Sequence, residues 1–110
     1  MRADAAPSTA LSLDGRRVLL TQSRDFMGPA LEAVFRRLGA TVVADPRPLA
    51  DDPGAAASVV ADAGPIDVLL LHLAVPAPAT PVEQVVEEEW RSVFAHLVDP
   101  VPRLAAAVLP

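Results

Sequence analysis

Residues 17–44 read RVLLTQSRDFMGPALEAVFRRLGATVVA, and the fold class follows from their pattern. The first five, Arg17–Thr21, form a short apolar run with polar flanks, which is typical of a buried strand. From Met27 to Gly39 the apolar residues recur at helical spacing and predict an amphipathic helix. Residues 40–44 predict a second strand. A strand, a helix and a strand within about 30 residues form a βαβ unit, whose right-handed crossover makes the strands parallel.

The following residues repeat this alternation of helix and strand. Asp52 is expected to be the N-cap of a helix that has Pro53 at its first position and ends at Ala63. Residues 66–71, IDVLLL, are the most apolar segment and predict a third strand. Because a parallel strand covered by helices on both faces needs an unbroken apolar run, we expect this strand at the centre of the sheet.

Prolines divide the C-terminal part of the chain. Residues 75–81 contain three prolines and predict an extended loop. A helix is expected from Thr80 or Pro81, with Trp90 as a core or interface residue. Pro100 and the proline at 102 should kink or break this helix before a second helical stretch over residues 103–109. The order of elements predicts an α/β fold, a Rossmann-like doubly wound parallel sheet of about three strands with flanking helices.

Composition excludes several classes of protein. The chain has 110 residues, 52% of them apolar, and no Cys, which excludes a disulfide framework and a Cys-based zinc site. The net charge is −5 and all nine basic residues are scattered Arg, a poor pattern for nucleic-acid binding. No apolar run is long enough for a membrane span, and the first residues carry no signal peptide. We expect a cytoplasmic protein with no nucleic-acid or membrane partner, and a disordered N-terminal arm over residues 1–12.

The predicted strands place three loops at one edge of the sheet: residues 22–26, 45–47 and 72–81. Ligands of open α/β sheets bind beyond the carboxyl ends of the strands, near the point where the strand order reverses. His72, in the third loop, and His96, on the last long helix, offer catalytic or metal-binding nitrogens. Neither has another His or a Cys at ligand spacing, so polar loop and helix positions are expected, with no metal and no catalytic residue assigned.

Three segments carry a family resemblance: residues 13–28, LDGRRVLLTQSRDFMG; residues 67–74, DVLLLHLA; and residues 88–110, with EEWR and RLAAAVLP. These segments resemble parts of the short-chain dehydrogenase/reductase family. The first resembles the family's first strand and its Thr-Gly-x-x-x-Gly-x-Gly motif. The second resembles its Asp-Val-Leu-Val-Asn-Asn-Ala-Gly strand, and the third resembles its long interface helix. The resemblance implies that residues 13–110 are the N-terminal portion of a Rossmann-like nucleotide-binding domain. It also implies an oxidoreductase with NAD or NADP as cofactor.

The resemblance implies four cofactor-binding residues: Thr21, Met27, Gly28 and Asp45. Gly28 matches the last motif glycine and would let the helix pack closely, while the helix N-terminus near Met27 would face the pyrophosphate. Asp45 stands where the family places the acid that binds the adenosine ribose, which favours NAD because a carboxylate repels a 2′-phosphate. The alternative is that Asp45 only begins a turn before a proline. Two arginines that could accept a 2′-phosphate, Arg24 and Arg47, are expected to be solvated surface residues.

The sequence also departs from the family pattern. Gln22 and Phe26 replace two motif glycines, and Phe26 would occupy space that a dinucleotide needs. After Asp45 the family has a further helix and edge strand, which are missing here together with half of the adenine pocket. The family's catalytic Ser and Tyr-x-x-x-Lys pair lie beyond position 110, and the sequence has no Tyr and no Lys. We therefore expect a truncated domain that is inactive alone.

Two other functions remain open. Residues 26–28, FMG, also resemble the altered loop of halohydrin dehalogenases, which are related to the reductases but bind no nicotinamide, so the chain could be part of a cofactor-independent lyase. The other alternative is a non-catalytic remnant or interaction module. Because the reductase family dimerises through its long helix, we expect a homo-oligomer through the C-terminal helix, with Val93, Phe94, Leu97 and residues 104–109 on the shared face.

Overall fold

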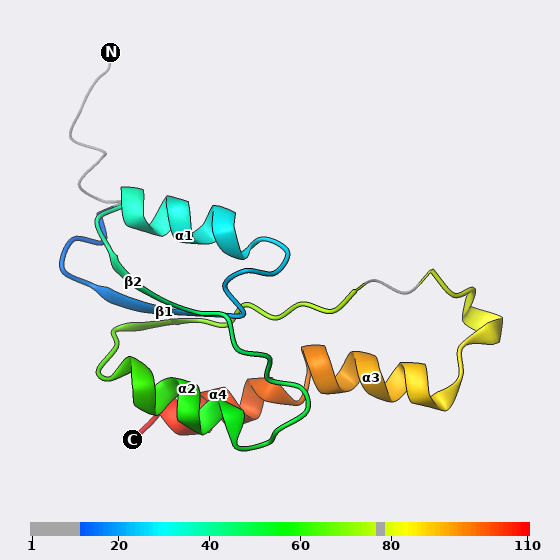
Figure 1. The fold of residues 1–110 in the computed structure, drawn as a ribbon. Helices are drawn as coiled ribbons and strands as arrows, with labels where there is room; N and C mark the ends of the chain where they lie inside the picture. The colour runs from blue at the N-terminus through cyan, green and yellow to red at the C-terminus, as the bar shows by residue number, and fades with distance from the viewer. Residues whose placement is uncertain (1–11, 77–78) are drawn as a thin grey trace, which may run out of the picture.

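A computed structural model describes residues 12–76 and 79–110 and shows an α/β fold with one parallel sheet (Figure 1). The strands are β1 (Arg17–Thr21), β2 (Thr41–Asp45) and β3 (Val68–Leu70). Their order across the sheet is β2-β1-β3, with Leu19 of β1 opposite Val43 on one side and Leu69 on the other. The predicted α/β class and the parallel direction of the strands are confirmed.

The third strand differs from its prediction in length and position. β3 has three residues instead of the six at 66–71, and it lies at one edge of the described sheet. The central strand is β1, whose Val18, Leu19 and Leu20 are fully buried, whereas all of β3 is half-buried. A uniform apolar run reflects cover by helices on both faces, which an edge strand also needs, so the run does not identify the centre of a sheet.

Helices cover both faces of the sheet (Figure 1). On one face lies α1 (Gly28–Arg37), and on the other lie α2 (Ala55–Ala63) and α4 (Pro100–Val108). Since side chains alternate along a strand, β1 serves two cores. The core on the α1 side contains Val18, Leu20, Ala40 and Val42. The core on the other side contains Leu19, Leu49, Ala56, Val59, Ala63 and Leu104. The expected place of Leu104 on a shared oligomer face is therefore wrong, because its side chain is fully buried within the chain.

The boundaries of the first βαβ unit agree with the sequence pattern to within one residue. The start of α2 does not, because Gly54 and not Asp52 precedes its first helical residue. The Asp52 carboxylate accepts the Gly54 N–H at 2.8 Å. It therefore stabilises the turn before the helix, as Asp side chains commonly do, and the predicted N-cap at Asp52 is wrong.

The long helix predicted from Thr80 or Pro81 is two separate elements, and the second predicted helical stretch is a third element. A 3₁₀ turn, η2 (Val82–Gln84), precedes α3 (Glu87–Leu97), and the break before α4 falls at residues 98–99. The next helix begins at Pro100 and not near residue 103, because proline at the first helical position has no N–H that needs a partner. Figure 1 shows α3 projecting from the sheet, and no residue of α3 is buried.

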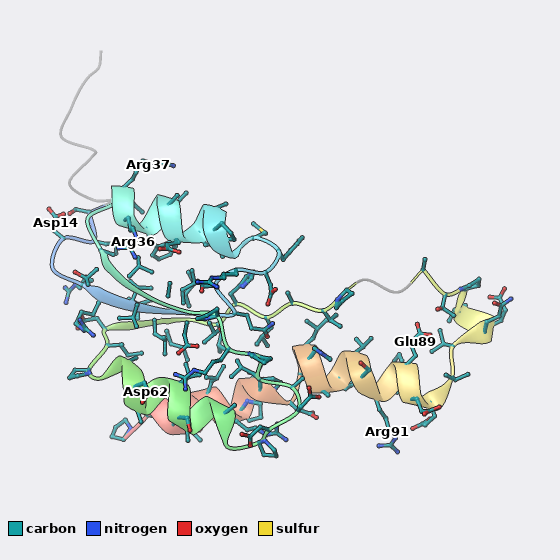
Figure 2. All side chains as sticks on the ribbon, in the orientation of Figure 1. Asp14, Arg36, Arg37, Asp62, Glu89 and Arg91 are labelled. Atoms are coloured by element: carbon teal, nitrogen blue, oxygen red, sulfur yellow. The ribbon has the colours of Figure 1, made fainter. Side chains whose placement is uncertain are left out.

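Charged side chains mark the outer surface of the helices. Arg36 and Arg37 lie in the last turn of α1, and Glu89 and Arg91 project from α3 on opposite sides (Figure 2). The expected arm at residues 1–12 lies outside the described residues apart from Ser12, whose Oγ accepts the Asp14 N–H at 3.2 Å. In the described part of the chain, no helix has the length and apolarity needed to cross a membrane.

Candidate functional site

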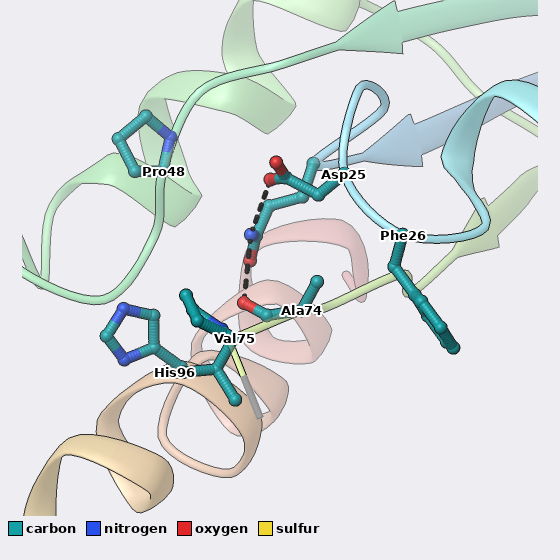
Figure 3. A pocket seen from close by; sticks show the side chains of 8 residues that line it. Asp25, Phe26, Pro48, Ala74, Val75 and His96 are labelled. Atoms are coloured by element: carbon teal, nitrogen blue, oxygen red, sulfur yellow. Dashed lines mark hydrogen bonds between the residues drawn. The ribbon is translucent and has the colours of Figure 1, made fainter. Parts of the chain in front are cut away.

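An open cleft of about 420 Å³ lies at the carboxyl edge of the sheet (Figure 3). Its walls come from the loops after all three strands and from α3. The lining residues are Gln22, Asp25, Phe26, Pro48, Ala74, Val75, Pro76 and His96. The cleft therefore lies where the strand pattern predicts a ligand site, although only the first and third predicted loops contribute lining residues and the second is represented by its neighbour Pro48.

Thr21 joins the ends of two strands behind this cleft. Its hydroxyl donates to the His72 carbonyl oxygen at 2.7 Å and accepts the His72 N–H at 3.0 Å. Thr21 is the last residue of β1 and is 1% exposed, so its hydroxyl serves the fold and does not face solvent. This pair of hydrogen bonds fixes the segment that follows β3 against the end of β1.

Gly28 allows α1 to approach the β1–α1 loop. It is buried at the start of the helix, and a Cβ there would clash with the backbone carbonyl of Ser23. This agrees with the packing role that the motif comparison implies for Gly28. Met27 precedes it as the half-exposed N-cap. The Gly28 N–H donates to the Asp25 carbonyl at 2.7 Å and Pro29 has no N–H, so two positions of the first turn offer no donor to a ligand.

The β1–α1 loop contains two residues with left-handed backbone angles. Gln22 and Phe26 both have φ of 42°, a conformation that costs a residue with a side chain about 1–2 kcal/mol. The Gln22 amide donates to the Asp25 carboxylate at 3.1 Å and to the Ala74 carbonyl at 3.3 Å, which connects the loop to the chain after β3 (Figure 3). Phe26 has fewer contacts to hold it in place, since 83% of its surface is exposed.

Asp45 ends β2 and forms an ion pair with Arg47. The Arg47 guanidinium donates to both carboxylate oxygens, with Nη2 to Oδ2 at 2.6 Å, and the Arg47 backbone N–H donates to Oδ1 at 2.9 Å. The hydrogen bonds from the Arg47 side chain hold the pKa of Asp45 below its ordinary value, against the opposing effect of burial. Arg47 also pairs with Asp62 of α2 at 2.9 Å, so the expectation that it is only a solvated surface residue is wrong.

His72 is buried behind the cleft with one ring nitrogen unpaired. Its Nδ1 lies 3.2 Å from the Thr21 carbonyl oxygen and 3.1 Å from the Gln22 carbonyl oxygen. Its Nε2 is buried and has no partner in the part of the chain that the structure describes. The ring of Phe26 stacks on the imidazole with centroids 6.4 Å apart and an interplanar angle of 13°.

The four residues predicted from the family motif do not form one surface. Thr21 and Gly28 support the β1–α1 loop from inside, Met27 lies at the start of α1, and Asp45 is engaged at the end of β2; none of them lines the cleft. The β1–α1 loop to which the motif belongs does line the cleft, but through Gln22, Asp25 and Phe26 instead of the four predicted residues. Burial of His72 was missed, because periodicity gives no signal in a loop.

No protein-family model matches this sequence, and no curated protein matches it at a significant level. Within residues 12–76 and 79–110, no group of three or more acidic or histidine side chains lies close enough together to hold a metal ion. The chemistry of the site therefore has to be argued from its own residues. These provide a largely apolar cleft with one carboxylate, one amide, the half-buried His96 and a second histidine, His72, buried behind the wall.

Proposed function

We propose that this chain is the N-terminal part of a short-chain dehydrogenase/reductase-like oxidoreductase and forms the NAD(P)-binding half of a Rossmann-like domain. The observation that carries the proposal is the backbone of the β1–α1 loop. Left-handed φ angles occur at Gln22 and Phe26, the two positions where the family motif has its first two glycines. The third motif glycine is present as Gly28, where a side chain does not fit. The loop thus follows a glycine-type path although two of its glycines are replaced.

The topology supports the same proposal. Since β2 and β3 flank β1 on opposite sides, the chain reverses its direction across the sheet between β2 and β3. Ligands of doubly wound sheets bind at such a switch point, beyond the carboxyl ends of the strands. The cleft takes its lining from the loop after β1 and from the segment after β3, which are the two sides of this point.

The residues present fit one end of a dinucleotide better than the other. Asp45 would accept the adenosine ribose hydroxyls in place of hydrogen bonds from Arg47, which is the more exposed partner of this partly buried ion pair, at 39% against 13%. The pyrophosphate end fits poorly in the observed conformation, because Asp25 places a negative charge in the cleft wall and Gly28 and Pro29 offer no free N–H. A bound nicotinamide would supply hydride chemistry. A Tyr–Lys pair for proton transfer cannot come from these 110 residues, which contain neither type.

The poor fit of a pyrophosphate to this site favours one alternative, a cofactor-independent protein similar to halohydrin dehalogenases. In that case Phe26 fills dinucleotide space permanently and the cleft serves a small substrate directly. Asp25 and the exposed ring of Phe26 are the specific observations behind this second candidate.

Calorimetric titration with NAD⁺ and NADP⁺ separates the two candidates. We expect weak saturable binding by the wild-type chain, tighter binding by Phe26→Gly, which restores a motif glycine, and weaker NAD⁺ binding by Asp45→Ala. Phe94→Gly is the matched control, because Phe94 lies on α3 and does not line this cleft. Absence of binding by both the wild-type chain and Phe26→Gly would overturn the NAD(P) proposal and leave the cofactor-independent candidate.

A further inference from the structure

The protonation of the His72 ring follows from its neighbours. Both groups close to Nδ1 are backbone carbonyl oxygens, those of Thr21 and Gln22, and a carbonyl oxygen can only accept a hydrogen bond. Nδ1 therefore carries the ring proton and donates it. In the neutral imidazole Nε2 is then a lone-pair acceptor, and this is the nitrogen that is buried without a partner. A buried acceptor left unpaired costs free energy, so such groups in native proteins call for an explanation.

Two residues of the cleft wall contact this imidazole, and a third is close to it in the chain. Gln22 accepts its Nδ1 proton, Phe26 stacks on its face, and Ala74 follows it two residues later in the chain. His72 thus lies directly behind the wall. Of the three, Phe26 is the one that can move, because most of its surface is exposed and its left-handed backbone is unfavourable for a residue with a side chain.

The chemistry of the cleft limits what can reach Nε2. The walls include the apolar side chains of Pro48, Val75 and Pro76, and the lining contains one carboxylate, Asp25, but no arginine. An anionic group would meet the Asp25 charge, and the one basic side chain of the lining, His96, has its Nδ1 engaged by the Ser92 carbonyl oxygen at 2.7 Å. An uncharged group with an apolar body and one hydrogen-bond donor matches both the walls and the unpaired acceptor.

We propose that the cleft binds a neutral hydroxyl-bearing ligand, which displaces the Phe26 ring and donates its hydroxyl proton in a hydrogen bond to Nε2 of His72. The inference deepens the proposed function, on which it rests for the cleft being a ligand site. A ribose hydroxyl and the hydroxyl of a simple alcohol both satisfy the requirement.

The test uses the full chain labelled with ¹⁵N and a matched pair of probes, benzyl alcohol and benzyl methyl ether, which differ in the hydroxyl proton. We expect the His72 imidazole resonances to show protonated Nδ1 and unprotonated Nε2. We expect benzyl alcohol to shift the Nε2 resonance saturably, with a dissociation constant about threefold to tenfold lower than that of the ether, as for one neutral hydrogen bond. His72→Asn should abolish this preference. The variant should fold, because the Thr21 hydroxyl bonds only backbone atoms of residue 72 and the Asn amide is also a donor for the carbonyl oxygens of Thr21 and Gln22.

A second arm titrates the wild-type chain and His72→Asn with NAD⁺. Weaker NAD⁺ binding by the variant assigns the hydroxyl to a ribose, whereas a preference for benzyl alcohol without any NAD⁺ binding assigns it to a small substrate. A proton on Nε2, equal binding of alcohol and ether, or a preference that survives His72→Asn overturns the inference. NAD⁺ binding that His72→Asn leaves unchanged, combined with no alcohol preference, overturns the inference while the proposed function stands.

Discussion

Strand β1 and helix α3 are both predicted from the spacing of their apolar residues, yet they end in opposite environments. β1 has a strand on each side and a core on each face, so its three central residues have no exposed surface. On α3, Trp90 is 56% exposed and Phe94 is 39% exposed. The difference shows that periodicity predicts an element but not what covers it. β1 is covered by α1 and β2, which are near in the chain, and by β3, α2 and α4, which are distant in it. Within the described residues nothing of comparable extent covers α3.

The largest expected effect comes from truncating one leucine in each region. Leu19→Ala removes a fully buried side chain, and we expect it to lower the free energy of unfolding by about 2–5 kcal/mol. Leu97→Ala on α3 removes a side chain that is 39% exposed and should cost about 1 kcal/mol or less. Urea denaturation of both variants measures the difference. Similar losses would show that the α3 face is buried in solution and would break the comparison.

The second largest effect is expected at the β1–α1 loop. Gly28→Ala adds a Cβ that meets the Ser23 carbonyl, and overpacking of this kind costs about 1–3 kcal/mol. Gly54→Ala is the matched control, since its Cβ would meet only the flexible end of Asp52 at 3.3 Å. Thermal unfolding of the two variants should therefore separate them by several degrees. If both melt alike, α1 does not need to approach the loop closely.

The exposed face of α3 offers a test by association. An isolated helix of eleven residues is marginal in water, so we expect α3 to be stabilised by self-association of the chain through Trp90 and Phe94. Light scattering over a range of concentrations should give a mass above that of the monomer, and Trp90→Glu should return it to the monomer. A wild-type chain that stays monomeric at high concentration would contradict this. Arg91→Glu, which changes charge on the same helix without removing apolar surface, is the control.

The sequence predicted the first strand, the first helix and the second strand. β1, α1 and β2 agree with their apolar patterns because each forms from residues close in the chain, and glycine and proline end them at defined positions. The length and place of β3 were not predictable, because a uniform apolar run does not tell an edge from a centre. The start of α3 was missed for a related reason. Val82 and Val86 continue its apolar pattern, but Val82 lies in the 3₁₀ turn and Val86 has an extended backbone.

The candidate site was predicted only in outline. The motif comparison indicated the β1–α1 loop and the need for glycine at position 28. It did not indicate that Gln22 bridges to Ala74 or that His72 is buried, because both depend on contacts between loops about 50 residues apart. Arg47 is another such case, since its second partner, Asp62, lies on α2. Long-range polar contacts leave no periodic signal in a sequence.

The smallest expected effect is the pH dependence of two ion pairs, that of Asp45 with Arg47 at the end of β2 and that of Glu87 with Arg91 on α3. Arg47 lowers the pKa of Asp45 below its ordinary 3.8, and a carboxyl whose pKa is lowered on folding stabilises the fold above its unfolded pKa. This contribution should be complete at neutral pH and be lost as the pH falls below about 4. Asp45→Asn should therefore show a smaller fall in melting temperature than the wild-type chain when the pH is lowered from about 5 to about 3. Glu87→Gln on α3 should change this fall in melting temperature less, because its ion pair is more exposed. Glu87 is 70% exposed and Arg91 is 77% exposed, whereas Asp45 is 13% exposed. An equal change in the two variants would mean that partial burial does not strengthen the pair at the end of β2.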